Sequence, residues 1–186
     1  MKTVSRRFQG FSLIELLLVL GVIAVLLVAA FVIYPQVRLA NQADTEVKNV
    51  TAIMANMEAA FRGKTTGITT ALANQARVFP SSMNGGNYTA SAPIQSSWGG
   101  SVRLMTTGVA SFDVVYQDVS QEMCLKWLPA LTLNFQWVQI QKGAAGGGGQ
   151  TWLKNPTHHP EMPTTTEIVT ACTNNGDPFL VAVGYR

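Results

Sequence analysis

The sequence predicts an α+β protein in which one long N-terminal helix packs against an antiparallel β-sheet. Two observations support this prediction. An apolar run near the N-terminus continues into a helical pattern of apolar and polar residues, which ends at about residue 61. From residue 63 onward, short apolar runs alternate with Gly, Pro, Asn and Ser, which is typical of strands and turns. The 186 residues have room for one ordinary domain and one extended segment.

The apolar run is long enough to cross a membrane. It spans the 23 positions of Phe11–Ile33, and residues 16–33 contain no charged side chain. A helix needs about 20 apolar residues to span the hydrocarbon core of a bilayer. Three positive side chains, Lys2, Arg6 and Arg7, precede the run. Because positive residues stay on the cytoplasmic side, we expect a cytoplasmic N-terminus and an exported remainder.

The formal net charge of +3 belongs to this leader alone. The chain has 13 Lys and Arg against 10 Asp and Glu, and three of the positive residues lie in the first ten positions. The rest of the chain is therefore formally neutral, and it has no basic stripe. This charge distribution indicates no nucleic-acid site.

Beyond the apolar run the helical pattern becomes amphipathic. The predicted apolar stripe recurs at intervals of three and four, apart from one of seven, and consists of Val37, Ala40, Val47, Val50, Met54, Met57 and Phe61. The charged residues expected on the other faces are Arg38, Asp44, Glu46, Lys48 and Glu58. At 1.5 Å per residue, a helix over residues 11–61 would be about 75 Å long. A helix with one bare apolar half suits a subunit that packs against copies of itself.

Pro35 lies inside this predicted helix. Its ring removes one backbone hydrogen-bond donor and clashes with the carbonyl group four residues earlier. We therefore expect a helix kink near residues 31–34.

The remainder is predicted to form a head built on the sheet. Four segments have the composition of strands: Ser101–Met105, Ser111–Tyr116, Leu131–Ile140 and Phe179–Val183. Turns or loops are expected at Asn84–Asn87, Trp98–Gly100 and Gly146–Gly149, and a short helix at Val119–Trp127. We expect Trp127, Trp137 and Trp152 to pack on the sheet or in subunit contacts.

Both cysteines, Cys124 and Cys172, lie in the exported part. An even number of cysteines in an oxidising compartment favours a disulfide. This disulfide would close a loop of just under 50 residues, and the chain-entropy model assigns about 4 kcal/mol to such a crosslink. The alternative is two buried free thiols.

One acidic residue, Glu15, stands near the start of the apolar run. A carboxylate within a membrane segment costs free energy and usually marks a functional position. The order of features is specific: a basic leader, Gly10, Phe11, an acid at the fifth position after the glycine, and a long apolar run. In this order the sequence resembles the class III signal peptide and N-terminus of type IV pilins and the related pseudopilins.

The resemblance implies processing followed by assembly. A membrane aspartic prepilin peptidase would cleave between Gly10 and Phe11 and methylate the new amino group of Phe11. The pilus assembly machinery, with its ATPase, would then extract the subunit from the membrane and polymerise it into a helical homo-oligomer. Glu15 would pair with the cationic α-amine of its own or a neighbouring subunit, because neither charge is easily buried alone.

The resemblance also implies a domain organisation. Residues 1–10 would be the cleaved leader and residues 11–62 the long helix, of which 11–33 cross the inner membrane. Residues 63–186 would form the periplasmic head, with a C-terminal region bounded by the disulfide as in type IV pilins. After assembly the subunit would belong to an extracellular pilus. No cofactor is expected.

Two features point to different pilin subclasses. Trp98-Gly99-Gly100, followed by a strand and then Cys124, resembles the head of type IVb major pilins, as in thin conjugative and bundle-forming pili. The ten-residue leader and the initial Phe11 are similar to type IVa pilins. The role of the filament stays open between adhesion, conjugation, DNA uptake, motility and secretion.

Several alternatives exist for the N-terminal segment. A secretory signal cleaved near Val28-Ala29-Ala30 would have an unusually long apolar core and would leave Glu15 unexplained. An uncleaved membrane anchor is a second alternative. A minor pilin or a type II secretion pseudopilin would have the same N-terminus; in the latter, Asp177 could belong to a calcium site. A bitopic enzyme or sensor with a periplasmic head is disfavoured, because no catalytic set stands out.

We expect no catalytic and no metal-binding residues. His158 and His159 are adjacent in a Pro-rich stretch without supporting carboxylates or thiolates, which favours an exposed loop. The Gly143–Gly149 segment lacks the Lys-Ser or Lys-Thr pair of a phosphate-binding loop. Asn49 and Asn87 begin formal glycosylation sequons.

Overall fold

The computed structural model describes residues 12–62, 64, 66–106, 111–142, 150–157, 159–174 and 179–185. The chain divides into two compact units, one up to Arg38 and one from Leu39 onward. Some residues singled out by the sequence lie outside the described ones: Gly10, Phe11, Gly143–Gly149, His158 and Asp177.

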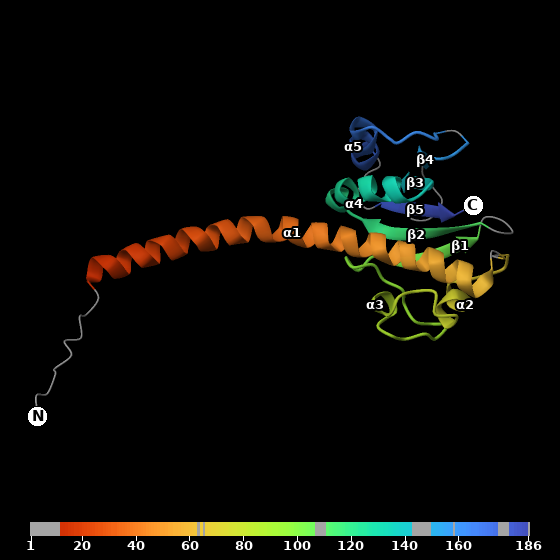
Figure 1. Cartoon of the computed structure of the whole chain (residues 1–186), viewed down its shortest axis with the longest axis horizontal. Helices are drawn as coiled ribbons and strands as arrows, with labels where there is room; N and C mark the ends of the chain where they lie inside the picture. The colour runs from red at the N-terminus through yellow and green to blue at the C-terminus, as the bar shows by residue number, and fades with distance from the viewer. Residues whose placement is uncertain are drawn as a thin grey trace, which may run out of the picture. The chain divides into compact units, whose positions relative to one another are not determined.

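The first element is a single helix, α1 (Leu13–Phe61), of 49 residues (Figure 1). In the described part of the chain, it is the one helix that is long and apolar enough to cross a membrane. Pro35 lies within α1, and the chain is helical on both sides of this residue. A kink at Pro35 stays a prediction.

The part of α1 in the second unit buries one stripe of side chains. Its buried residues are Ala43, Glu46, Asn49, Val50, Ile53 and Met57. The predicted apolar stripe was therefore partly wrong: Val37 and Ala40 are exposed, although Val50 and Met57 are buried. Val37 belongs to the first unit, outside the head. Conversely, Glu46 and Asn49, which sequence polarity places on the solvent face, are buried because they find hydrogen-bond partners in the head.

The head contains one five-stranded sheet with the strand order β1-β2-β5-β3-β4, in which all neighbours are antiparallel. Its strands are β1 (Val102–Thr106), β2 (Phe112–Val119), β3 (Trp137–Lys142), β4 (Gln150–Lys154) and β5 (Phe179–Tyr185). Three of the four predicted strands are confirmed as β1, β2 and β5. The sequence did not predict β4.

The predicted strand Leu131–Ile140 was wrong in its first half. Residues up to Asn134 belong to a helix, α4 (Gln121–Asn134), and only the end of the segment is strand β3. Ser120 caps α4, because its side chain accepts a hydrogen bond from the Met123 amide at 3.3 Å. Buried residues then follow at helical spacing: Cys124, Trp127, Leu128 and Leu131.

A further helix, α5 (Thr165–Asn174), was not predicted. It begins with a capping box formed by Thr164 and Glu167. The Glu167 carboxylate accepts hydrogen bonds from the Thr164 amide (2.7 Å) and hydroxyl (2.9 Å). In return, the Thr164 hydroxyl accepts a hydrogen bond from the Glu167 amide at 3.3 Å.

Two short helices, α2 (Thr70–Gln75) and α3 (Ser81–Asn84), lie between α1 and the sheet in sequence. α2 lies at the edge of the sheet beside β1. The Thr70 hydroxyl bonds to both the amide (3.0 Å) and the carbonyl (3.3 Å) of Leu104 in this edge strand. The predicted turns at Asn84–Asn87 and Trp98–Gly100 are confirmed, the second with Gly99 at φ 92°.

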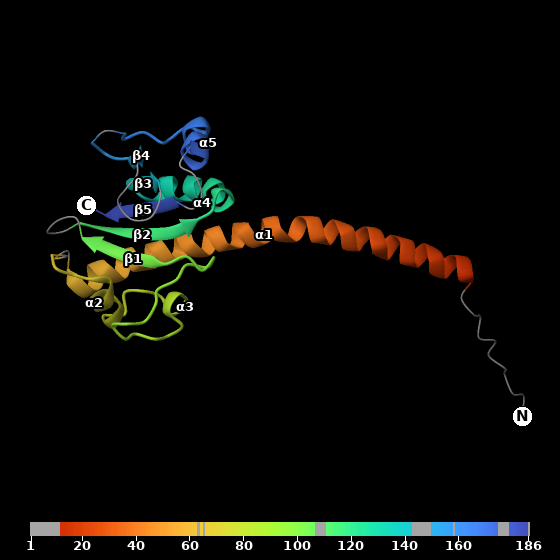
Figure 2. The same ribbon diagram turned by 180° about the vertical axis from the view of Figure 1, so that it is seen from behind.

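Residues 39–61 of α1 and helix α4 cover the same face of the sheet (Figures 1 and 2). Their buried side chains join those of the inward-facing strand residues in one core, which includes Val114, Tyr116, Val138, Ile140, Val181 and Val183. A smaller cluster of Val115, Leu180 and Ala182 lies on the other face.

The Glu167 cap predicts a pH-dependent contribution of α5 to stability. Hydrogen bonds from the Thr164 amide and then its hydroxyl lower the pKa of Glu167. A lowered folded-state pKa stabilises the protein above the ordinary glutamate pKa of about 4.3, and this stabilisation disappears as the pH falls through the lowered value. The variant Glu167→Gln should therefore unfold at a lower temperature than wild type at pH 7, with the difference shrinking below about pH 4.

Thermal unfolding followed by circular dichroism between pH 3 and pH 7 tests this expectation. Glu161→Gln is the matched control, because Glu161 is exposed and precedes the capping box. A difference between Glu167→Gln and wild type that does not change with pH would contradict the assignment.

Candidate functional site

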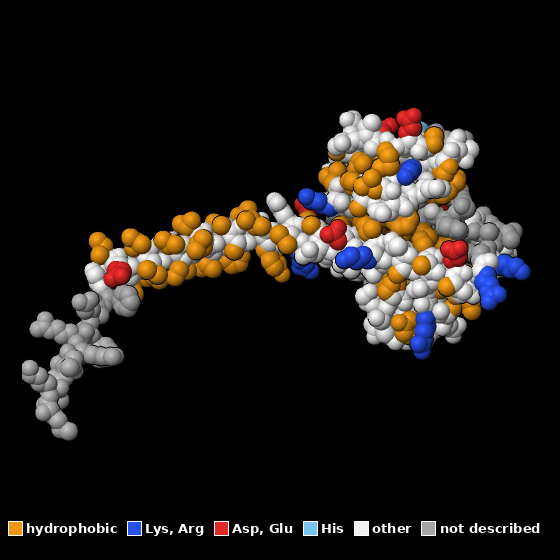
Figure 3. Space-filling model, in the orientation of Figure 1, with side chains coloured by type: hydrophobic (Ala, Val, Ile, Leu, Met, Phe, Trp, Pro, Cys, Tyr) orange, Lys and Arg blue, Asp and Glu red, His pale blue; other side chains and the backbone are white. Residues whose placement is uncertain are grey.

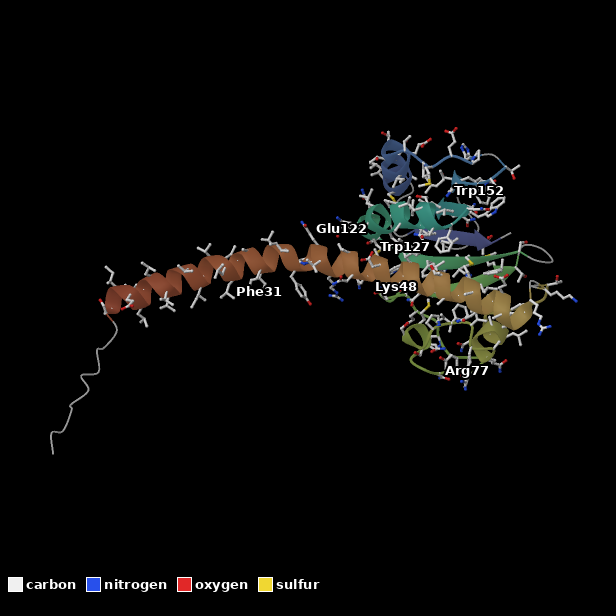
Figure 4. The ribbon with its side chains drawn as sticks, viewed as in Figure 1. Phe31, Lys48, Arg77, Glu122, Trp127 and Trp152 are labelled. Carbon is white, nitrogen blue, oxygen red and sulfur yellow. A yellow bond between two sulfur atoms is a disulfide. The ribbon has the colours of Figure 1, made fainter. Side chains whose placement is uncertain are left out.

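The described part of the first unit is an apolar surface with one acid at its start. Every large hydrophobic side chain from Leu13 to Ile33 is between 46% and 77% exposed. Figure 3 shows these side chains along the first part of α1, and Figure 4 shows Phe31 directed away from the helix. Monomeric soluble proteins rarely expose contiguous apolar patches of more than a few hundred Å². This segment therefore needs lipid or other protein around it.

Glu15 lies in the first turn of α1. Its amide donates to the Ser12 carbonyl at 3.0 Å, so the turn is already helical there. Glu15 is exposed, as are the two residues before it, Leu13 and Ile14. A negative charge in the first turn interacts favourably with the partial positive charge of a helix N-terminus. The structure thus places Glu15 on the apolar segment, whereas Gly10 and Phe11 lie outside the described residues.

The second unit holds a buried acid that the sequence analysis placed on a solvent face. Glu46 is completely buried, and its Oε1 accepts a hydrogen bond from the Ser97 amide at 2.5 Å. Gln42, one turn earlier, donates from Nε2 to the Ser97 carbonyl at 2.9 Å. Ser97 is thus bound to α1 through both its amide and its carbonyl, and we call these contacts the Ser97 clip.

An aromatic cluster follows the clip directly. Trp98 packs against Tyr116 of β2 and Trp127 of α4, with ring centroids 5.8 and 5.2 Å apart, and Tyr116 lies 4.7 Å from Trp127. Gly100 allows the chain to pass close to β2, because a Cβ there would overlap the Gln117 carbonyl. The Trp-Gly-Gly turn therefore connects α1, the sheet and α4.

Glu46 also affects Tyr116. Burial, and next the negative charge of Glu46, raise the pKa of Tyr116 well above its usual value, so its hydroxyl stays protonated. Neither Glu46 Oε2 nor Tyr116 Oη has a hydrogen-bond partner of standard geometry. The charge of the carboxylate is therefore its main effect on the pKa of the tyrosine. One feature of the sequence indicates that Glu46 is buried. Glu46 follows Ala43 by three residues and precedes Val50 by four, which places it on the same face of the helix as these two buried residues.

The two cysteines form the predicted disulfide. Cys124 of α4 and Cys172 of α5 are bonded, with their Cα atoms 5.9 Å apart. Both residues are buried. The bond joins α5 to the helix that carries Trp127, so it connects the C-terminal region to the aromatic cluster.

The described residues contain no cluster of His, Cys, Asp and Glu that could hold a metal ion. His159 is exposed, and its backbone pairs with Asn155. Of the two sequon asparagines, Asn49 is buried in α1, whereas Asn87 is exposed. The predicted packing of the tryptophans holds for Trp127, which is fully buried.

Comparison with known families agrees with this geometry. Residues 40–183 match the family described as PilS N terminal, and residues 5–31 match the prokaryotic N-terminal methylation motif. The chain belongs to the PilS N-terminal family and is a type IV pilin. The methylation motif of this pilin covers Gly10, Phe11 and Glu15.

Among solved structures, the pilin is similar to TcpA, a type IV pilin from Vibrio cholerae El Tor biotype. The two are 15% identical, with a TM-score of 0.54 over 78% of this chain and 99% of TcpA. At this identity the likeness establishes the fold alone: a long N-terminal helix with an antiparallel sheet. No curated relative matches the sequence.

The Ser97 clip predicts different effects of two substitutions at Glu46. Glu46→Gln keeps a side-chain oxygen for the Ser97 amide, whereas Glu46→Leu removes it. A hydrogen bond to a charged group contributes about 1.5–3 kcal/mol, so exchange of the Ser97 amide hydrogen should be at least tenfold faster in the leucine variant.

Hydrogen exchange followed by mass spectrometry over residues 94–101 measures this effect. The glutamine variant should stay closer to wild type than the leucine variant. Equal protection of Ser97 in the leucine variant and wild type would show that the bond to Glu46 does not hold this turn.

Proposed function

We propose that this pilin is the structural subunit of a type IV pilus. It would be cleaved after Gly10, methylated at Phe11 and polymerised into a helical surface filament through α1. The observation that carries the proposal is the exposed apolar surface of Leu13–Ile33, which has Glu15 in its first turn. The N-terminal methylation motif covers this surface up to residue 31. Packing of this surface against other copies would remove it from both water and lipid.

Specific contacts are needed, because lipid tails are already apolar and give no hydrophobic driving force for helix association. Pairing of Glu15 with the cationic α-amine of Phe11 in its own or a neighbouring subunit would supply one. Each charge alone would be costly among apolar helices, and their pairing would fix the axial register. Before assembly, residues 11–33 would hold the subunit in the inner membrane, with the head in the periplasm.

This proposal assigns the chain a structural role and no enzymatic one. The partners would be further copies of the chain, the prepilin peptidase and the pilus assembly machinery. Residues 1–10 would be the leader, 11–62 the long helix and 63–186 the head. Whether the filament serves adhesion, conjugation or another process depends on these partners.

Substitution of Gly10 tests the processing step. Gly10→Val adds a branched side chain at the bond to be cleaved, so the variant should keep its leader and form no filaments. Intact mass of the membrane-extracted protein measures this directly. A variant with the mass of the processed wild-type chain would refute cleavage between Gly10 and Phe11.

Substitution of Glu15 tests the assembly step separately. Glu15→Leu makes the segment more apolar, so insertion and cleavage should persist, while the yield of sheared filaments should fall at least tenfold because the α-amine loses its partner. Glu58→Leu is the matched control, since Glu58 is an exposed glutamate of the same helix within the head. Wild-type filament yield from Glu15→Leu would contradict the proposed pairing.

A further inference from the structure

The apolar part of α1 ends in a short segment with a single charge. After Glu15, the next charged residue of the chain is Arg38. The apolar run ends at Ile33, and the first compact unit ends at Arg38. Residues 34–38 therefore join the apolar segment to the head, and all five are exposed.

The length of this joining segment matches the thickness of a lipid headgroup layer. The 23 positions of Phe11–Ile33 would rise about 34 Å as a helix, against about 30 Å for the hydrocarbon core of a bilayer. A bilayer of about 40–45 Å in total leaves about 5–8 Å of headgroups on each side. Residues 34–38 rise about 7.5 Å, so they would cross the periplasmic headgroup layer when residues 11–33 span the membrane.

Three residues at this end of the apolar run lie on one face of α1. Phe31, Tyr34 and Arg38 are separated by three and four positions, which places them above one another on a helix. Phe31 is 77% exposed and Tyr34 is 69% exposed, and Figure 4 shows Phe31 directed away from the helix. Along this face an apolar ring is followed by a phenol and then by a guanidinium. This order matches the change from hydrocarbon to headgroups, where amphipathic rings are enriched.

The position of Arg38 favours contact with the bilayer. Side chains of an α-helix lean toward its N-terminus, so the Arg38 side chain leans back toward the apolar segment. No acidic residue lies three or four positions from Arg38 in the sequence, so no ion pair of this spacing along α1 competes for the guanidinium. A planar guanidinium binds phosphate through two parallel hydrogen bonds. A phosphate at the level of residues 34–38 would therefore give Arg38 an anionic partner.

We propose that Arg38 binds the lipid phosphates of the periplasmic leaflet before assembly, with Tyr34 in the same headgroup layer and Phe31 in the hydrocarbon below it. The apolar run ends five positions before Arg38, which brings the guanidinium to the level of the headgroups. Positive residues usually stay on the cytoplasmic side, so a positive charge on the exported side does not serve to orient the chain. This inference rests on the membrane stage of the proposed function and names a lipid contact within it.

Solid-state NMR of the pilin in phosphatidylglycerol vesicles tests this contact. The guanidinium carbons are isotope-labelled, and their dephasing by phosphorus nuclei is measured in phosphate-free buffer, so that the lipid is the source of phosphorus. The reference chain carries Arg6→Lys and Arg7→Lys, so the leader contributes no guanidinium whether or not it is cleaved. A hydrogen-bonded guanidinium carbon would lie about 4 Å from phosphorus. The reference chain should show strong dephasing, and addition of Arg38→Lys, which keeps the charge but has no guanidinium, should lower it at least about fivefold.

Arg77→Lys is the matched control, because it removes one guanidinium from an exposed position of the head. Its dephasing should stay within about twofold of the reference chain, since Arg77 lies outside the segment at the headgroup layer. Absence of dephasing in the reference chain, or equal dephasing after Arg38→Lys, would overturn the inference while leaving the proposed function intact. Absence of cleavage and of filaments would overturn the proposed function without changing this measurement.

Discussion

The structure depends on one constraint: the first part of a single helix is exposed and apolar, while a later part of the same helix is buried in the head. Apart from Glu15, the side chains of α1 from Leu13 to Ile33 are exposed and apolar, so this part is compatible with lipid or with other helices. From Ala43 to Met57 the same helix buries one stripe in the core of the head. The head therefore forms around a helix whose first part must find its own partners, and this division follows from the distribution of apolar residues along the chain.

Within the head, the interactions that hold α1 are polar as well as apolar. Glu46 and Gln42 bind the two backbone groups of Ser97, and the next residue, Trp98, packs on Tyr116 and Trp127. The disulfide then ties the helix of Trp127 to α5. A continuous set of contacts thus runs from α1 through the Trp-Gly-Gly turn to the C-terminal region. Burial of a carboxylate costs free energy unless the group is paired or hydrogen-bonded. The hydrogen bond from the Ser97 amide to Glu46 therefore makes the attachment of the head to α1 specific.

Much of the fold could be predicted from the sequence, because its strongest signals are local. Length and hydropathy define α1, and the cysteine count with the exported compartment predicted the disulfide. The helical spacing of Glu46 from Ala43 and Val50 indicates the buried face, but its hydrogen-bond partner could not be predicted, since Ser97 lies 51 residues away. The apolar run from Leu131 is compatible with both a helix and a strand, and only the cap at Ser120 and the burial of Leu131 decide the outcome. Helix α5 is rich in Thr, a weak helix former, and depends on its capping box and on Cys172.

The measurement that most directly tests the account is the intact mass and N-terminal sequence of the protein in sheared surface material and in membranes. We expect an abundant chain in the sheared fraction that starts at N-methylated Phe11 and keeps the Cys124–Cys172 disulfide. A processed chain confined to membranes would contradict its role as the main filament subunit. A chain that starts at Met1 or near Phe31 would contradict the processing and the filament together.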